Sequence, residues 1–125
     1  MIKINERSEL PIYEQIILGM KELILKGALR QGDRLPSVRE LSAAVLVNPN
    51  TVSKAYQELE RQGIIETLRG KGTFVAKPSS PGMEKERLEK FRSTFRQLLV
   101  EATYLGIGAD QIKGWTEQFY KEIKE

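Results

Sequence analysis

The chain has 125 residues and a formal net charge of +3, and 40% of its residues are hydrophobic. A chain of this length buries one modest core and leaves room for an appendage, so two large domains are excluded. It contains no cysteine and no histidine, which removes disulfides, thiolate chemistry and the commonest metal ligand. We therefore expect no metal site and no cofactor, and an enzyme would have to use carboxylates, lysines and hydroxyls alone.

No part of the sequence approaches the roughly 18 consecutive apolar residues that a membrane-spanning helix requires. The first nine residues contain Lys3, Glu6, Arg7 and Glu9 and few apolar side chains, unlike a secretion signal. We expect a cytoplasmic protein with no membrane partner.

The positive charge lies in the first part of the chain. Residues 1–77 contain twelve Lys and Arg against nine Asp and Glu, whereas residues 78–125 contain eight of each. An excess of three charges is too small to indicate a nucleic-acid partner by itself, so the motifs must decide.

A change in composition separates these two parts. The segment KPSSPG at 77–82 has two prolines and a glycine, which end regular secondary structure. We place the first domain at 1–77, a linker at 78–82 and a tail at 83–125.

Two helices are predicted before residue 47. The first follows Pro11, which suits a first helical turn, and ends at Gly27. Its apolar positions recur at helical spacing: Ile12, Ile16, Met20, Leu23 and Ile24. The second begins at Ser37, because Ser37 and Glu40 have the spacing of a capping box.

A third helix follows the second after a short turn. Asn48 suits an N-cap and Pro49 the first helical position, and Gly63 ends the helix. Its inner face is formed by Val52, Ala55, Tyr56 and Leu59, so we expect Tyr56 in the core. Two short helices joined by a tight turn predict a helix-turn-helix at about 37–56.

A β-hairpin is predicted next, at about 64–76. Ile64–Leu68 and Thr73–Ala76 have strand character, and the glycines of Arg69-Gly70-Lys71-Gly72 suit a turn with positive φ. The order of helix, helix-turn-helix and hairpin describes a winged helix with a basic wing tip. The predicted fold is therefore mainly α with a small β-hairpin.

The tail is expected to form an antiparallel helical hairpin. Apolar residues follow a heptad pattern from about Glu84 to Leu105, at Leu88, Phe91, Phe95, Leu98, Ala102 and Leu105. Gly106 and Gly108 end this helix, and a second begins near Asp110. Its apolar stripe consists of Ile112, Trp115, Phe119 and Ile123.

Two copies of this tail would form a four-helix core, which makes a homodimer the favoured interpretation. The expected dimerisation residues are Leu88, Phe91, Phe95, Leu98, Leu105, Ile112, Trp115 and Phe119. Alternatively, both stripes pack only on each other or on the first domain. An unknown small-molecule effector could also bind the tail aromatics, Tyr104 among them, although a dimer core is the simpler explanation.

The polar residues of the winged helix suit DNA. A recognition helix presents its first turns to the major groove, and Asn48, Asn50, Thr51 and Ser53 could meet base edges or phosphates. Lys54 suits a phosphate contact, and the backbone amides beside Ser37 could bind an anion. Arg69 and Lys71 suit contacts with the minor groove or the DNA backbone.

These residues also have simpler explanations. Ser37 and Asn48 would cap their helices without DNA, and Gly70 and Gly72 would serve any tight turn. Arg34 and Arg39 could be surface charges paired with Asp33 and Glu40.

The chain from Leu10 to Ala76 resembles the DNA-binding domain of the GntR family of bacterial transcription regulators. The resemblance lies in LPIYEQI, in GDRLPSVRELSAAVLVNPNTVSKAYQELERQGIIET and in RGKGTFVA, several separate motifs in the family's order. It implies that Arg34 and Arg39 contact phosphates and base edges. One residue departs from the pattern: Leu46 stands where the family usually has glycine, so we expect strain in the turn.

The resulting set of DNA-contacting candidates comes from both helices and the wing. It comprises Arg34, Ser37, Arg39, Asn48, Pro49, Asn50, Thr51, Ser53, Lys54, Arg69, Gly70 and Lys71.

The short tail resembles the YtrA subfamily, whose members often repress transporter operons. The favoured function is a homodimeric repressor that binds double-stranded DNA at a near-palindromic operator. The alternative is a winged-helix module that binds proteins rather than specific DNA. We expect no enzyme, because no acid, base, nucleophile and phosphate loop converge in the sequence.

Overall fold

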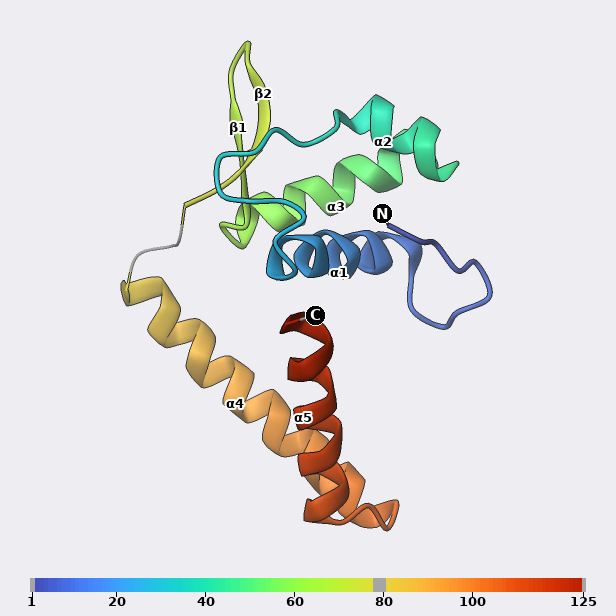
Figure 1. Cartoon of the computed structure of the whole chain (residues 1–125), viewed down its shortest axis with the longest axis vertical. Coiled ribbons are helices and arrows are strands. Elements are labelled where there is room, and N and C mark those ends of the chain that lie inside the picture. The colour runs from blue at the N-terminus through green and yellow to red at the C-terminus, as the bar shows by residue number, and fades with distance from the viewer. Residues whose placement is uncertain (1, 78–80, 125) are drawn as a thin grey trace. The chain divides into compact units, whose positions relative to one another are not determined.

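The structure, a computed structural model, describes residues 2–77 and 81–124, except for the side chains of 81–84. Within these ranges it contains five helices and a two-stranded antiparallel sheet (Figure 1). The chain divides into two compact units, an N-terminal unit of Met1–Pro78 and a C-terminal unit of Ser79–Glu125. The prediction of a mainly α fold with a small hairpin is confirmed.

Helix α1 (Ile12–Leu25) follows Pro11, and the chain leaves it through Gly27 at φ 79°. Ile16, Ile17 and Met20 are buried on its inner side. This agrees with the predicted helix, since the apolar spacing selects one face of α1 for the core.

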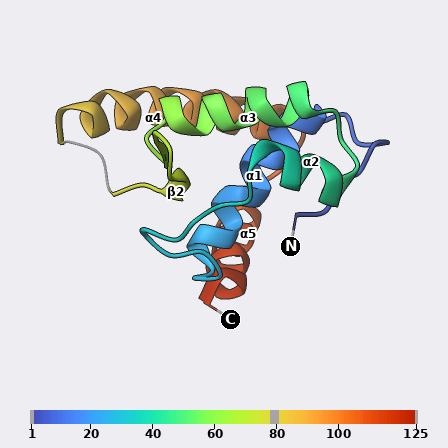
Figure 2. The same ribbon diagram turned by 90° about the horizontal axis from the view of Figure 1, so that it is seen from above.

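Helices α2 (Val38–Val45) and α3 (Pro49–Arg61) form the helix-turn-helix. Helix α3 ends before Gly63, whose φ of 76° suits glycine. Figure 2 shows α1 crossing α3 at an angle, with α2 beside them. The three helices enclose one core, in which the largest fully buried side chains are Ile16, Met20, Leu41, Val52, Leu59 and Ile65. Tyr56 also belongs to this core, as predicted, and is 6% exposed.

Strands β1 (Ile65–Leu68) and β2 (Gly72–Val75) form the wing, with Ile65 opposite Val75 and Leu68 opposite Gly72. The chain at 32–35 runs beside β2, which the sequence did not predict. Its backbone is tied there because Leu35 N donates to Thr73 O at 2.8 Å and Val75 N donates to Asp33 O at 2.9 Å. The wing is therefore fastened to the segment that leads into α2.

The N-terminal segment is a second unpredicted feature. The side chain of Ile2 lies against Gly19 of α1, where an added Cβ would come within 3.0 Å of it. Gln15 fastens the same segment, because its amide accepts from Asn5 N at 2.8 Å and donates to Leu10 O at 2.8 Å. Ile2 and Ile4 thus add to the core beside α1.

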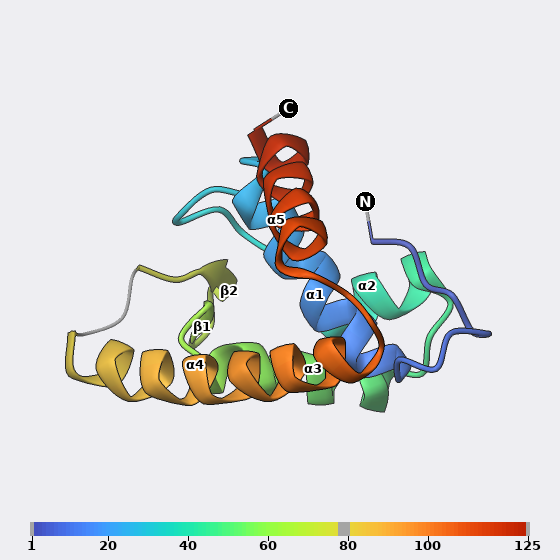
Figure 3. The same ribbon diagram turned by 90° about the horizontal axis from the view of Figure 1, so that it is seen from below.

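The C-terminal unit consists of α4 (Pro81–Tyr104) and α5 (Ala109–Lys124). Helix α4 begins inside the segment predicted as a linker, because Pro81 is at a position where proline is compatible with a helix. Linker residues 78–80 lie outside the described residues. The chain reverses at Gly106, where φ is 79°, and the two helices then diverge (Figures 1 and 3).

The apolar stripes of the tail remain exposed because α4 and α5 diverge. Phe91 is 66% exposed, Phe95 43% and Trp115 53%, while Ala102 near the turn is buried. The arrangement in which the stripes only cover each other is therefore not found.

Candidate nucleic-acid interface

The turn of the helix-turn-helix depends on a strained residue and a buried hydroxyl. Leu46 has φ 57° and ψ 48°, the left-handed conformation expected where the family usually has glycine. Val47 N donates to Ser42 O at 3.1 Å, and the Ser42 hydroxyl donates to Val47 O. Ser42 is 8% exposed. Sequence reasoning missed this role, because a serine inside a helix gives no signal of a partner across the turn.

The start of α2 is built by the predicted capping box. Glu40 N donates to Ser37 Oγ at 3.1 Å, and Ser37 N donates to Glu40 Oε1 at 3.1 Å. The hydrogen bond from the Ser37 backbone is the main cause that lowers the pKa of Glu40. Arg39, the second residue of α2, is exposed. The cap therefore fixes the backbone that carries the Arg39 side chain.

A buried tyrosine connects α3 to this position. The Tyr56 hydroxyl donates to Pro36 O at 2.7 Å, and burial raises the pKa of Tyr56 to about 12. Because Tyr56 lies in the middle of α3 and Pro36 directly before the cap, this bond sets the two helices against each other. Sequence reasoning placed Tyr56 in the core without predicting this bond.

The first turn of α3 has the expected cap. Asn48 Oδ1 accepts from Asn50 N at 2.8 Å, and Pro49 occupies the first turn. Asn50 is exposed, whereas Thr51 and Ser53 are half-buried. Asn48 therefore caps the helix as predicted, and its remaining hydrogen-bonding capacity stays at the surface.

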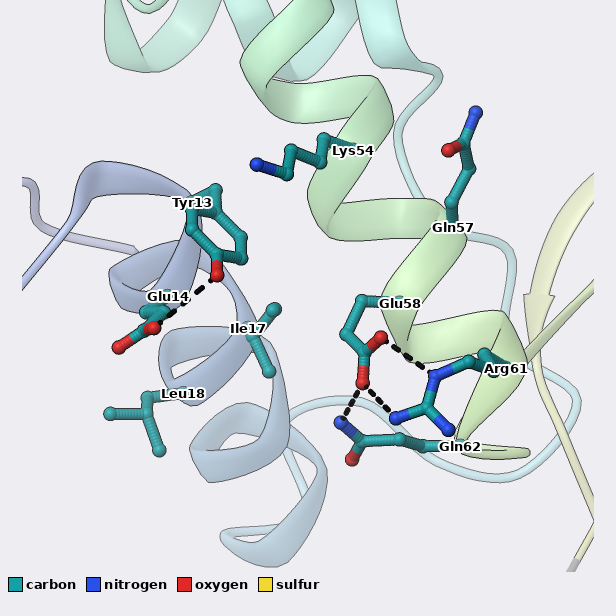
Figure 4. Close-up of a pocket in the computed structure, with 9 residues that line it drawn as sticks. All are labelled: Tyr13, Glu14, Ile17, Leu18, Lys54, Gln57, Glu58, Arg61 and Gln62. Carbon is teal, nitrogen blue, oxygen red and sulfur yellow. Dashed lines mark hydrogen bonds and ion pairs between the residues drawn. The ribbon is translucent and has the colours of Figure 1, made fainter.

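Lys54 lies beside a groove between α1 and α3. Its Nζ is 4.4 Å from the centre of the Tyr13 ring, a cation–π contact. The groove has a volume of about 680 Å³ (Figure 4) and is lined by Tyr13, Glu14, Ile17, Leu18, Lys54, Gln57, Glu58, Arg61 and Gln62. Lys54 is thus positioned by an aromatic ring, which sequence reasoning did not predict.

The other end of this groove is closed by an ion pair. Arg61 Nη2 and Nε donate to Glu58 at 2.6 and 2.8 Å, and Gln62 donates to the same carboxylate at 2.7 Å. The hydrogen bonds from Arg61 and then Gln62 lower the pKa of Glu58 to about 2. These three side chains satisfy one another at the end of α3.

Arg34 and the wing tip form the remaining basic part. A Cβ on Gly72 would meet Arg34 Nε at 3.1 Å, so the guanidinium lies against the start of β2, beside the turn of the wing. Arg69 and Lys71 are exposed at the turn, where Gly70 has φ 78°. The predicted positive φ at the glycines of this turn is confirmed.

The simpler alternative, in which Arg34 pairs with Asp33 and Arg39 with Glu40, is not found in the described ranges. Asp33 accepts instead from Arg30 N at 2.8 Å, and Glu40 accepts from Ser37. An ion pair in these ranges joins Arg61 and Glu58. Arg34 and Arg39 therefore keep their charges available to an outside partner.

All twelve candidate residues lie in the N-terminal unit, and all are exposed or half-buried. They occupy the cap of α2, the first turns of α3, the wing tip and the segment beside the wing. A helix-turn-helix followed by a basic two-stranded wing defines the winged helix-turn-helix class.

Comparison with known proteins gives the family. The model of the bacterial regulatory proteins of the gntR family matches residues 12–75. The HTH-type transcriptional repressor YtrA of Bacillus subtilis (strain 168) is 47% identical over 124 residues, which cover 99% of this chain and 95% of that protein. The chain belongs to the GntR family, as its motifs indicate.

Solved structures of other regulators also resemble this chain. The crystal structure of a transcriptional antiterminator from Listeria monocytogenes EGD-e has a TM-score of 0.90 and 43% identity, over 100% of this chain and 93% of that one. The crystal structure of the AraR DNA-binding domain in complex with operator ORX1 has a TM-score of 0.53 and 32% identity, over 58% and 89% of the two chains.

No helix in the described ranges is long and apolar enough to cross a membrane. The same residues contain no group of three or more acidic, histidine or cysteine side chains suited to a metal ion.

Proposed function

We propose that this protein is a homodimeric transcription repressor that binds a near-palindromic DNA operator. The observation that carries the proposal is the exposed Arg39 at the capped start of α2, together with the exposed polar residues at the start of α3. A helix start of this kind offers backbone amides to phosphates, and an arginine beside it can contact a guanine edge.

Each candidate has a role in this proposal. Arg39 donates to guanine O6 and N7, and Asn50, Thr51 and Ser53 meet bases or phosphates in the major groove. Ser37 brings the start of α2, and Asn48 and Pro49 the start of α3, against phosphates, and Lys54 adds a cation. Arg34, Arg69, Gly70 and Lys71 approach the neighbouring backbone or minor groove.

The tail supports the homodimer. Leu88, Leu98 and Leu105 are 58%, 56% and 76% exposed, and Phe119 is 44% exposed. Monomeric proteins rarely leave so many large apolar side chains together in water, and two copies would bury them in a four-helix core. The two N-terminal units, related by two-fold symmetry, would then contact half-sites about one helical turn of DNA apart.

Relatives support the same function. The Bacillus subtilis protein is named as a transcriptional repressor, and the AraR domain was solved on an operator. The resemblance to the YtrA subfamily extends the proposal to a target operon that encodes a membrane transporter.

The test is enrichment of genomic duplex fragments by the purified protein, followed by sequencing and by affinity measurements across salt concentrations. We expect a two-fold symmetric site whose affinity falls steeply with salt, because phosphate contacts release counterions. Arg39→Ala should weaken binding by about 1 to 3 kcal/mol and relax one base preference in each half-site.

Arg7→Ala is the matched control, because Arg7 is exposed in the N-terminal segment and belongs to none of the candidates. It should bind as the wild type does. If the wild-type protein enriches no sequence, operator binding is refuted and the protein-interaction alternative takes its place.

A further inference from the structure

The outer face of α3 extends beyond the residues assigned above. At 3.6 residues per turn, Gln57 falls on the side of the helix opposite the buried Val52 and Leu59. The other outward side chains on this line are Asn50, Lys54 and Arg61, all exposed. Gln57 therefore shares the surface that a recognition helix presents to DNA.

The neighbours of Gln57 are already engaged within the protein. Arg61 donates to Glu58, and Lys54 lies over the Tyr13 ring. The side chain of Gln57 makes no hydrogen bond or ring contact with any residue in the described ranges. Figure 4 shows its amide extending away from Glu58 and Arg61. Its donor and acceptor are thus both available at the surface.

We propose that Gln57 recognises an adenine in the major groove and so sets base preference at one position of each half-site. This rests on the operator binding proposed above. A glutamine amide has an acceptor and two donors on one plane, which match the N6 donor and N7 acceptor of adenine. A lysine or arginine at this position would instead favour guanine or a phosphate.

The position of Gln57 along α3 separates its target from that of Asn50. The two residues are seven positions apart, which is about 10 Å along a helix with a rise of ~1.5 Å per residue. Base pairs are stacked at ~3.4 Å, so a helix lying along the groove places them about three base pairs apart. Gln57 thus adds a further determinant of base preference to the half-site.

The experiment selects binding sites from a random duplex library with the wild type, Gln57→Ala and Gln57→Glu. We expect the wild type to enrich adenine at one position of each half-site. Gln57→Ala should lose that preference alone and bind the best wild-type site about tenfold more weakly. Gln57→Glu should shift the same position toward cytosine, whose N4 donates to a carboxylate.

Two controls accompany these variants. Gln111→Ala removes an exposed glutamine of α5 in the other unit and should leave every base preference unchanged. Alanine favours helix, so Gln57→Ala should keep the wild-type thermal midpoint by circular dichroism.

The outcomes separate this inference from the function on which it rests. If Gln57→Ala weakens binding equally at all sites without changing a base preference, the inference is overturned and Gln57 contacts the backbone. Unchanged affinity and preference would overturn it as well. If the wild type itself enriches no sequence, the proposed function fails together with the inference.

Discussion

At the scale of single residues, Leu46 combines strain with exposure. Its left-handed conformation costs a non-glycine residue roughly 1 to 2 kcal/mol, and its side chain is 87% exposed. The side chain therefore offsets little of this cost by packing. The turn holds this geometry because Ser42 and Val47 are bonded across it.

Leu46→Gly should raise the free energy of unfolding by about 1 kcal/mol, since glycine adopts positive φ without a steric penalty. Denaturant unfolding monitored by circular dichroism measures the change. Leu25→Gly is the control, because Leu25 is also exposed but belongs to α1. There glycine should lower the stability. A loss of stability in Leu46→Gly would show that the leucine side chain makes a contact worth more than the strain.

Tyr56→Phe should lower the free energy of unfolding by about 1 kcal/mol at pH 7, because Pro36 O loses its buried donor. The pKa of Tyr56 is raised from 10.0 to about 12. The hydroxyl's contribution is therefore complete below pH 10 and is lost as the pH rises through 12. Tyr104→Phe, at a 90% exposed position, should leave stability unchanged at pH 7. Equal stability of both variants would contradict a structural role for the Tyr56 hydroxyl.

At the scale of elements, local signals predicted the helices and the hairpin well. The helix ends are marked by Ser37 with Glu40, by Asn48 with Pro49, and by Gly63. These residues act on backbone close to them in the chain, so sequence spacing is enough to recognise them.

Contacts distant in sequence were not predictable in the same way. The backbone bond between Leu35 and Thr73, and the packing of Ile2 on Gly19, depend on where the chain returns after many residues. Composition does not encode these contacts. Pro81 was misassigned because proline both interrupts helices and suits their first turn.

The candidate interface was predictable in its residue types but not in its orientations. The motifs indicated Arg34 and Arg39, yet the hydrogen bonds that Asp33 and Glu40 accept from nearby backbone instead emerge only from the packed structure. The engagement of Lys54 by Tyr13 likewise requires α1 and α3 to be side by side.

The end of α3 should respond to acid through Glu58. Its pKa is about 2, below the ordinary 4.5, mainly because Arg61 donates to its carboxylate. Because the pKa of Glu58 is lower in the folded protein, its ionised carboxylate stabilises the fold fully above pH 4.5. This contribution is lost as the pH falls toward 2. We therefore expect the thermal midpoint of the wild type to fall more steeply over that interval than that of Glu58→Gln.

Glu22→Gln provides the control for this acid response, because Glu22 is exposed in α1 and its carboxylate accepts no hydrogen bond in the described ranges. Its curve should run parallel to that of the wild type. Parallel curves for the wild type and Glu58→Gln would mean that the ion pair with Arg61 does not persist in solution.

At the scale of the whole molecule, the two units differ in how they bury apolar residues. The N-terminal unit encloses its own core, whereas α4 and α5 leave Phe91, Phe95 and Trp115 exposed. Phe91 and Phe95 stack at 6.3 Å between ring centres, so they form one apolar surface. The heptad spacing predicted this surface and favoured a partner for it, and the divergence of α4 and α5 leaves it exposed.

Phe91→Glu should convert the proposed dimer to a monomer, because it places a charge in the four-helix core. Sedimentation velocity measures the mass, and binding to a symmetric operator measures the consequence. In a dimer, binding of one N-terminal unit raises the effective concentration of the other at its half-site, which increases affinity by about 10² to 10⁴-fold. The monomeric variant should therefore bind the whole operator at least ~100-fold more weakly. Affinity for an isolated half-site should stay unchanged, since the N-terminal unit is intact.

Lys90→Glu separates this effect from a general change of charge, because Lys90 is exposed on α4 outside the heptad stripe. It should remain dimeric and bind the operator with at most a small loss from its negative charge. If Phe91→Glu stays dimeric, the tail stripe is not the interface. If Phe91→Glu becomes monomeric yet keeps full operator affinity, the two N-terminal units do not bind the operator together. The proposed near-palindromic operator must then be replaced by a single site.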